Sequence, residues 1–148
     1  MEKGYLDSLA KNLFSILPLF KKKLIKPEEN MKNLLDLSPS HIQILFFLES
    51  EGKHSISEIG EKLYISKSNM TPLINKLIDN NLAERIRDEN DRRYVNIGIT
   101  NKGKRLTESH RTLVANNLKD RLQGLSKKDL KELSKSIESV KNIISKLD

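Results

Sequence analysis

The stretch from Ser55 to Thr100 reads SISEIGEKLYISKSNMTPLINKLIDNNLAERIRDENDRRYVNIGIT, and it decides the fold. Ser55 and Glu58 have the spacing of a capping box, so we expect a helix to begin near Ile56. A second helix is expected to begin after Ser66, because a serine hydroxyl at this position can accept from an unpaired amide of the first turn. The stretch therefore predicts two helices joined by a short turn.

The second of these helices is predicted to have two distinct faces. Its apolar residues recur at helical spacing and form one continuous stripe: Met70, Leu73, Ile74, Leu77 and Ile78. The opposite face is short, polar and rich in hydrogen-bonding groups, which suits contact with bases in a DNA groove. An ordinary solvated helix face is the alternative, and this pattern alone favours it. The outward residues are Ser68, Asn69, Pro72, Asn75, Lys76 and Asp79, with Lys67 and Thr71 at the edges.

A β-hairpin with a charged tip is predicted to follow. Residues 82–87 and 94–99 largely alternate between apolar and polar and are rich in β-forming residues. A tip with adjacent arginines, here Arg92 and Arg93, can enter a minor groove, where negative potential is concentrated. We expect Asp91 to hold one guanidinium through a bidentate pair. For the tip alone, a solvated charged loop is an equally good interpretation.

Composition bounds the function without identifying it. The chain has 148 residues, of which 36% are hydrophobic and 5% aromatic, so we expect a modest core that burial between subunits would supplement. A net charge of +7 favours a polyanionic partner, although an anionic membrane surface or simple solubility would also fit. The absence of cysteine excludes disulfides, thiolate zinc sites and thiol-based redox switches. No apolar run is long enough for a signal peptide or a membrane span, so a cytoplasmic location is expected.

The segments before the central stretch are predicted to be mainly helical. Leu6, Leu9 and Leu13 begin an amphipathic helix in which Pro18 is expected to cause a kink or a break. The run Lys21–Lys23 is better interpreted as a solvated helix end than as a phosphate-binding site. Residues 26–36 are expected to form a loop or a short helical turn. A further helix is expected to begin with Ser38 as N-cap and Pro39 as its first residue, to pack through Ile42, Leu45, Phe46 and Leu48, and to end at Gly52.

Two helices are expected after the hairpin. Thr100 is predicted to cap the first, and Ser126 is predicted to cap the second after a break at Gly124. The last helix carries apolar residues in three-four alternation, which is typical of helices that pack side by side. We favour dimerisation over packing within one chain alone. These residues are Leu130, Leu133, Ile137, Val140, Ile144 and Leu147.

No catalytic pattern is present. His41, His54 and His110 have no metal-ligand spacing with one another, and we expect ordinary surface or half-buried roles for them. A histidine and carboxylate site assembled in a dimer stays open as an alternative. The sequence contains no phosphate-binding glycine loop, nucleophile elbow or paired-carboxylate motif. We therefore predict that the chain is not an enzyme, and that it needs neither a cofactor nor a metal.

The combined order of these features resembles the MarR (multiple-antibiotic-resistance regulator) family of bacterial transcription factors. The resemblance rests on Ser57–Gly60, Ser66–Ile74, Leu82–Arg85, Asp91–Arg93 and Thr100–Gly103 at their mutual spacings. It implies a mainly α (α+β) fold, namely a winged helix-turn-helix with N- and C-terminal dimerisation helices. It also implies a homodimer that binds a pseudo-palindromic DNA operator, most often as a repressor, and that responds to a small molecule whose identity the sequence does not indicate.

The resemblance also implies which parts of the chain bind DNA and which form the dimer. Residues 1–148 would form a single MarR-type domain, with residues 38–100 as the DNA-binding lobe and residues 1–37 and 101–148 as the dimerisation helices. The dimerisation residues would be Leu6, Leu9, Leu13, Leu130, Leu133, Ile137, Val140, Ile144 and Leu147. The DNA-binding residues would be Ser66, Lys67, Ser68, Asn69, Thr71, Pro72, Lys76, Arg87, Asp91, Arg92 and Arg93. A nonspecific architectural DNA-binding protein and a protein-docking module that binds no nucleic acid are the alternative functions.

Overall fold

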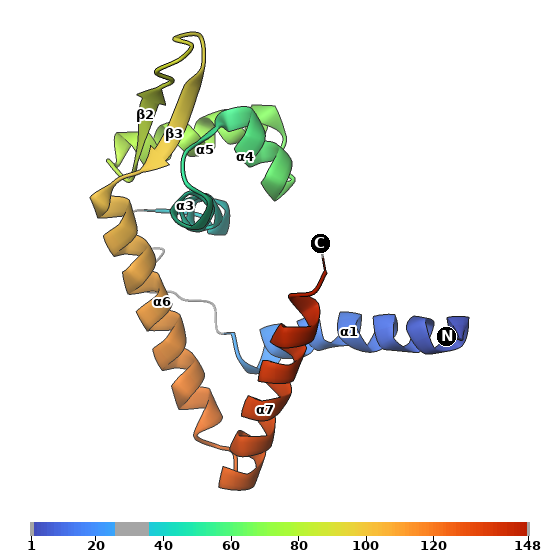
Figure 1. Ribbon diagram of the computed structural model, residues 1–148. Coiled ribbons are helices and arrows are strands. Elements are labelled where there is room, and N and C mark those ends of the chain that lie inside the picture. Colours follow the sequence, from blue (N-terminus) through green and yellow to red (C-terminus); the bar gives the residue numbers. More distant parts are fainter. Residues whose placement is uncertain (1, 26–35, 148) are drawn as a thin grey trace. The chain divides into compact units, whose positions relative to one another are not determined.

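A computed structural model describes residues 2–25 and 36–147, and these are mostly helical with one small antiparallel sheet (Figure 1). The expected loop or turn at residues 26–36 lies outside the described residues except for Asp36. Two compact units divide the chain: Pro27–Leu113 forms one, and Met1–Lys26 with Val114–Asp148 forms the other. The elements are α1 (Lys3–Lys23), α3 (Pro39–Glu51), β1 (His54–Ser55), α4 (Ile56–Leu63), α5 (Lys67–Asp79), β2 (Ala83–Arg87), β3 (Val95–Ile99), α6 (Asn101–Leu122) and α7 (Lys127–Ile144).

The helix starts follow the predicted caps. In α4 the Glu58 amide donates to Ser55 Oγ and the Ser55 amide donates to Glu58 Oε1, each across 3.2 Å, as a capping box requires. Helix α3 begins at Pro39, and the Ser38 amide donates to Nδ1 of His41 across 2.9 Å. His41 is thus a buried part of a helix cap.

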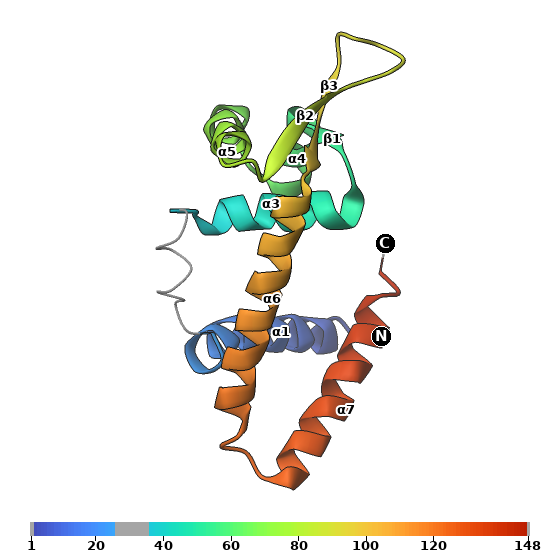
Figure 2. The same cartoon turned by 90° about the vertical axis from the view of Figure 1, so that its left-hand side faces the viewer.

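The hairpin forms as predicted and gains a third strand. Strand β3 lies between β2 and β1, and both pairings are antiparallel, with Ile97 opposite Arg85 on one side and His54 on the other (Figure 2). The sequence did not predict β1, because a strand of two residues is too short to show an alternating pattern. The Asn81 backbone before the hairpin adopts φ 59°, a left-handed conformation that asparagine tolerates.

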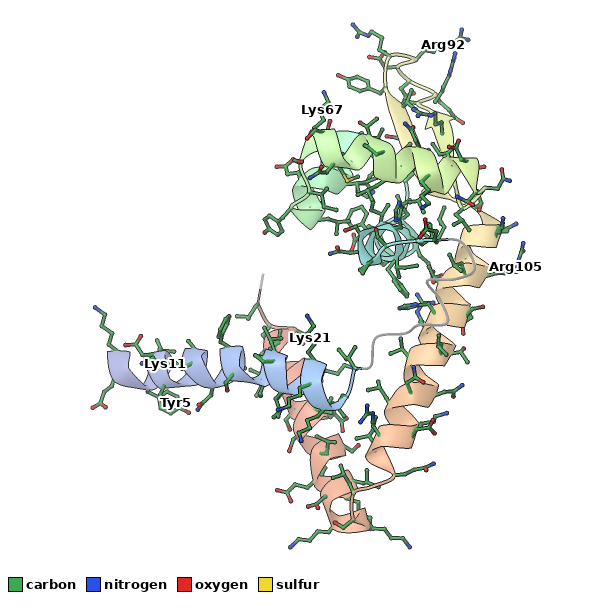
Figure 3. All side chains as sticks on the ribbon, turned by 180° about the vertical axis from the view of Figure 1, so that it is seen from behind. Tyr5, Lys11, Lys21, Lys67, Arg92 and Arg105 are labelled. Carbon is green, nitrogen blue, oxygen red and sulfur yellow. The ribbon has the colours of Figure 1, made fainter. Side chains whose placement is uncertain are left out.

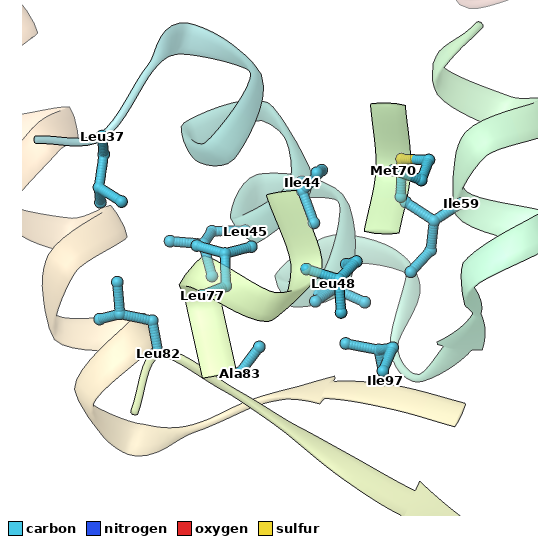
Figure 4. Close-up of a cluster of buried hydrophobic side chains, with 11 residues drawn as sticks. Leu37, Ile44, Leu45, Leu48, Ile59, Met70, Leu77, Leu82, Ala83 and Ile97 are labelled. Atoms are coloured by element: carbon cyan, nitrogen blue, oxygen red, sulfur yellow. The ribbon is translucent and has the colours of Figure 1, made fainter. Parts of the chain in front are cut away.

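One hydrophobic core joins α3, α4, α5 and the hairpin (Figure 4). The predicted apolar face of α5 is confirmed, since Met70, Ile74 and Leu77 are buried and Leu73 and Ile78 pack partly buried against them. In α3 the expected Leu45 and Leu48 are buried, together with Ile44, which the sequence analysis did not include. The remaining core residues are Leu37, Ile59, Leu82, Ala83 and Ile97.

Phe46 does not take the core position that the sequence suggested. Its ring lies 5.6 Å from that of His110 in an edge-on contact, and the Arg111 guanidinium lies 4.9 Å from its centre. Both partners belong to α6, so Phe46 holds α3 against the first half of α6. The i, i+1 step from Leu45 to Phe46 turns the side chain by about 100°, which explains why the two neighbours face different elements.

Two prolines lie inside helices without ending them. Helix α1 continues through Pro18 to Lys23, so the break that we considered there is absent. Helix α5 likewise continues through Pro72. A proline lacks an amide donor and its ring crowds the carbonyl four residues earlier, but the residues on either side retain their own donors. None of the helices in residues 2–25 and 36–147 is both long and apolar enough to cross a membrane.

Candidate nucleic-acid interface

Helix α5 starts after Ser66, but not through the predicted hydroxyl cap. Ser66 has the extended backbone of an N-cap, yet its side chain makes no capping hydrogen bond. Its Oγ lies 3.3 Å from Oγ of Ser68, so the two hydroxyls satisfy each other. The prediction that Ser66 accepts from a first-turn amide is therefore wrong, and the reason is competition from a nearby hydroxyl.

The outward face of α5 is accessible where the sequence predicted it. Lys67, Ser68, Asn69, Thr71 and Pro72 are all exposed, while Met70 between them is fully buried. Figure 3 shows Lys67 projecting from the end of α5, away from the core. The helix therefore presents one polar side to solvent and one apolar side to the lobe, as a helix that reads a groove must.

Gly60 in α4 lets α5 approach closely. A Cβ atom at this position would lie 2.8 Å from the carbonyl oxygen of Ile65 and 3.0 Å from Cγ of Met70. Both distances are too short for a normal contact, so alanine would push the two helices apart. Gly60 thus allows close packing between α4 and α5.

Lys76 is a predicted DNA contact of α5 that is bonded to a residue far away in the sequence. Its Nζ donates to the main-chain carbonyl of Asp36 across 2.5 Å and lies 3.4 Å from the Asp36 carboxylate. The predicted role in phosphate contact would require Lys76 to leave these oxygens or to share its three donors with them. The pairing spans 40 residues of sequence and has no local signal.

The hairpin tip separates its two adjacent arginines. Arg93 donates from Nε to Oδ1 of Asp91 across 3.1 Å and from Nη2 to Oδ2 across 2.9 Å, which is the predicted bidentate pair. These bonds hold the pKa of Asp91 below its usual range and raise that of Arg93. Arg92 makes no hydrogen bond or ion pair with any residue from 2–25 or 36–147, and Arg87 is exposed at the end of β2. Figure 3 shows Arg92 at the far end of the hairpin.

The residues after the hairpin lock it to α6. Thr100 Oγ1 donates to the Asn81 carbonyl across 2.6 Å and accepts from the Gly103 amide across 3.0 Å, which confirms Thr100 as the cap of α6. Lys102 Nζ donates to the Asn80 carbonyl across 2.9 Å. A Cβ atom on Gly103 would lie 2.3 Å from the Leu82 carbonyl oxygen, so only glycine fits there. The Thr100–Gly103 motif thus connects the start of α6 to the residues that precede the hairpin.

A polar cluster ties α3 to α6. Glu49 accepts from the Thr107 hydroxyl and, across 2.8 Å, from Nη2 of Arg111. The bond from Thr107, followed by the bond and charge of Arg111, holds the pKa of Glu49 below its usual range. These contacts span about sixty residues of sequence, so sequence reasoning had no signal with which to find them.

Another contact that the sequence did not reveal joins α5 to the hairpin. Nη2 of Arg85 on β2 donates to Oδ1 of Asn75 on α5 across 3.0 Å. Asn75 belongs to the predicted outward face, but it was not among the predicted DNA-contact residues. Its partner is ten positions away, which is too far for helical periodicity to indicate the pairing.

Residues 2–25 and 36–147 contain no group of three or more histidine or acidic side chains placed to hold a metal ion. An open hollow of about 510 Å³ lies beside α4 and is lined by His54, Glu58, Glu61, Lys62 and Tyr64. None of the predicted DNA-contact residues lines it, so the hollow and the outward face of α5 are separate features.

Comparison with known proteins agrees with this geometry. The protein-family model described as MarR family matches residues 37–95, which contain α3, α4, α5, β2 and the hairpin tip. Over residues 37–95 the chain matches the MarR family. The HTH-type transcriptional regulator SarZ of Staphylococcus aureus is 30% identical over 96 residues, a match that covers 65% of each protein. The matched region of the chain therefore spans a little less than two thirds of the length of SarZ.

Solved structures show that the MarR fold extends beyond the matched residues. The transcriptional regulator Tm0710 from Thermotoga maritima aligns with a TM-score of 0.75 at 21% identity, covering 95% of this chain and 96% of its own. A MarR family protein from Bacillus stearothermophilus aligns with a TM-score of 0.69 at 22% identity, covering 98% and 99%. At these identities the likeness concerns the fold. The expected winged helix-turn-helix, with helices before and after it in the sequence, is confirmed.

Proposed function

We propose that this MarR-family chain is a homodimeric, sequence-specific DNA-binding transcription regulator that represses its target and is released by a small-molecule effector. One observation carries the DNA-binding part. A single compact unit presents both the polar face of α5 and an arginine of the hairpin tip that has no bonding partner among the described residues. SarZ and Tm0710, which resemble this chain, are both called transcriptional regulators.

In the proposed complex, α5 lies in a major groove. Ser68, Asn69, Thr71 and Pro72 would lie nearest the bases, since they are exposed on the first two turns of the helix. Ser66, the exposed N-cap residue, would lie at the start of this surface. Lys67 would face a phosphate. Lys76 would also face a phosphate once its ammonium group leaves Asp36. Hydroxyl and amide groups suit base edges because they both donate and accept hydrogen bonds.

The hairpin tip would enter the adjacent minor groove. Arg92 is the residue proposed to insert, because it is exposed and makes no bond with the described part of the chain. Asp91 would contribute indirectly, by holding Arg93 in a fixed position beside it. Arg93 and Arg87 would then meet the phosphate backbone, where cationic side chains add affinity without sequence preference.

A second copy of the chain would cover the apolar helices. None of the described residues in α1 or α7 is buried, although both helices are amphipathic. At about 100° per residue, the apolar side chains of α1 spread over about 220° of its circumference, whereas packing against one neighbour needs a stripe of about 100°. Exposed positions include Leu6, Leu9, Leu13, Ile137, Val140, Ile144 and Leu147, while Leu130 and Leu133 are half-buried. Two lobes related by a two-fold axis would then read a pseudo-palindromic operator.

Effector control would act on this dimer. A ligand that prefers a lobe arrangement mismatched to the operator would release the DNA by shifting the population between the two arrangements. Repression and effector response rest on the family resemblance. We also propose that the protein is cytoplasmic and has no enzymatic activity.

Binding to labelled duplex DNA tests the proposal. The full chain would be titrated against the region upstream of its own gene and against a scrambled duplex, at several salt concentrations. We expect the specific duplex to bind about 10³-fold more tightly, or more, at physiological salt. Equal and steeply salt-dependent binding to both duplexes, with no site recovered from random sequence, would indicate an architectural protein. No binding at low salt would favour the docking module.

A further inference from the structure

The hydrogen bond between Asn75 and Arg85 fixes the orientation of an amide on the outward face of α5. Nη2 of Arg85 lies 3.0 Å from Oδ1 of Asn75, and both residues are exposed. A guanidinium has donors but no acceptor, so the amide oxygen and not the amide nitrogen must face it. The chemistry of Arg85 therefore determines which way the Asn75 amide is turned.

Asn75 lies on the same side of α5 as the residues proposed to meet the bases. At about 100° per residue, its direction around the helix axis differs from that of Ser68 by only about 20°. The buried residues Met70, Ile74 and Leu77 lie on the opposite side. Asn75 therefore continues the polar face about two turns further along the helix.

The NH2 group of Asn75 is left available to a ligand. No described residue accepts a hydrogen bond from it, while the oxygen of the same amide is taken by Arg85. In a major groove its donors would find acceptors on guanine (N7 and O6), adenine (N7) and thymine (O4). Cytosine presents only its N4 amino group, which is a donor, and would therefore oppose the amide with like polarity.

We propose that Asn75 is a specificity-determining residue that excludes cytosine at one position of each half-site, and that Arg85 is its positioning residue. The inference rests on the proposed function and adds to it the base preference of one side chain. Asn75 acts by direct contact with a base edge. Arg85 acts through Asn75, by preventing the amide from rotating to present its oxygen.

Selection from a library of randomised duplexes, performed with the full chain, tests the inference. The wild-type protein should recover cytosine about tenfold less often than the other bases at one position of each half-site. Asn75→Ala should accept all four bases at that position. Asn75→Asp should reverse the preference towards cytosine, because a carboxylate keeps its bond to Arg85 but offers only acceptors to the groove.

The role of Arg85 has its own signature. Arg85→Ala should admit cytosine at the same position without favouring it, since the freed amide can present either edge. The dependence of binding on salt should stay unchanged. If Arg85 instead contacts a phosphate, the variant will keep the wild-type base preference and lose about 0.9 from the salt slope, and the positioning role is then wrong.

The control separates charge from recognition. Gln43→Glu makes the same amide-to-carboxylate change at an exposed position of α3, and its selected sequences should equal those of the wild type. A wild-type protein that selects a site, together with Asn75 variants that select the same bases as wild type, would overturn the inference and leave the proposed function standing. A wild-type protein that selects no sequence at all would overturn the proposed function, and the inference with it.

Discussion

Arg93 is bound to Asp91 by two parallel hydrogen bonds, of 3.1 Å from Nε and 2.9 Å from Nη2, while its neighbour Arg92 has no such partner in the described chain. The same residue type at adjacent positions thus has two different environments. A paired guanidinium is already ordered, and a carboxylate offsets its positive charge. An unpaired guanidinium offers its full charge to a polyanion. This difference leads to a prediction for Arg92.

Arg92→Ala is expected to weaken binding to specific and scrambled duplexes alike, by about 1 kcal/mol or more in each case. The salt dependence should fall by about one phosphate contact, because the lost group is a cation that reads groove potential and not a base edge. Fluorescence anisotropy at several salt concentrations would measure the affinity and its salt dependence. Arg121→Ala, which removes an exposed cation from α6, should leave both quantities unchanged. An intact salt slope in Arg92→Ala would exclude the minor-groove role.

Gly103→Ala is expected to destabilise the lobe by about 2 kcal/mol, since the added Cβ would meet the Leu82 carbonyl oxygen at 2.3 Å and Ile99 Cγ1 at 2.6 Å. The contact with the Leu82 carbonyl oxygen is with the backbone, so a side-chain rotation cannot relieve it. Urea unfolding followed by circular dichroism would report the change. Gly124→Ala is the matched control, with its nearest neighbour at 3.8 Å, and it should change stability by less than about 0.5 kcal/mol. Equal stabilities for the two variants would contradict this packing.

The free energy of unfolding should depend on the protonation of His41. Its Nδ1 accepts from the Ser38 amide and must be unprotonated to do so. Burial, followed by the charge of Lys76, holds the pKa of His41 below its usual 6.5, against an opposing effect of Asp36. Below pH 6.5 the unfolded chain therefore binds more protons than the folded chain, and stability falls as the pH decreases. Above pH 6.5 the contribution is complete and constant.

Urea midpoints between pH 5.5 and 8 would measure this dependence. One proton contributes at most about 1.4 kcal/mol per pH unit. His41→Gln cannot titrate, so its stability should lose this component of the slope while retaining the contributions of other groups. Parallel curves for the wild type and His41→Gln would show that the cap does not respond to pH.

Dimer formation should depend on the exposed apolar face of α1. Leu13→Glu places a charge on a side chain that is 47% exposed in one subunit and that the dimer would bury. We expect the variant to be monomeric in sedimentation equilibrium, with the DNA-binding lobe still folded because its core lies in α3, α4, α5 and the hairpin. Ser8→Glu, on the polar side of α1, should stay dimeric. A Leu13→Glu protein that remains dimeric would place the interface elsewhere.

Local patterns determined which elements form. The capping box of α4, the apolar stripe of α5, the hairpin around residues 88–93 and the cap at Thr100 all depend on residues a few positions apart. Helical and strand periodicity repeat over such short distances, so the chain reveals them without a structure. The bidentate pair at Asp91 could be predicted for the same reason, because its two residues are only two positions apart.

Tertiary structure alone decided which polar groups meet. Asn75 with Arg85, Lys76 with Asp36 and Glu49 with Arg111 are separated by 10, 40 and 62 residues. Whether such side chains touch depends on how whole helices pack, and packing is set by the shared hydrophobic core and not by their own positions in sequence. The sequence by itself therefore determined the helix, the hairpin and the face that could read DNA. Only the fold decided which side chains on that face are free and which are already held.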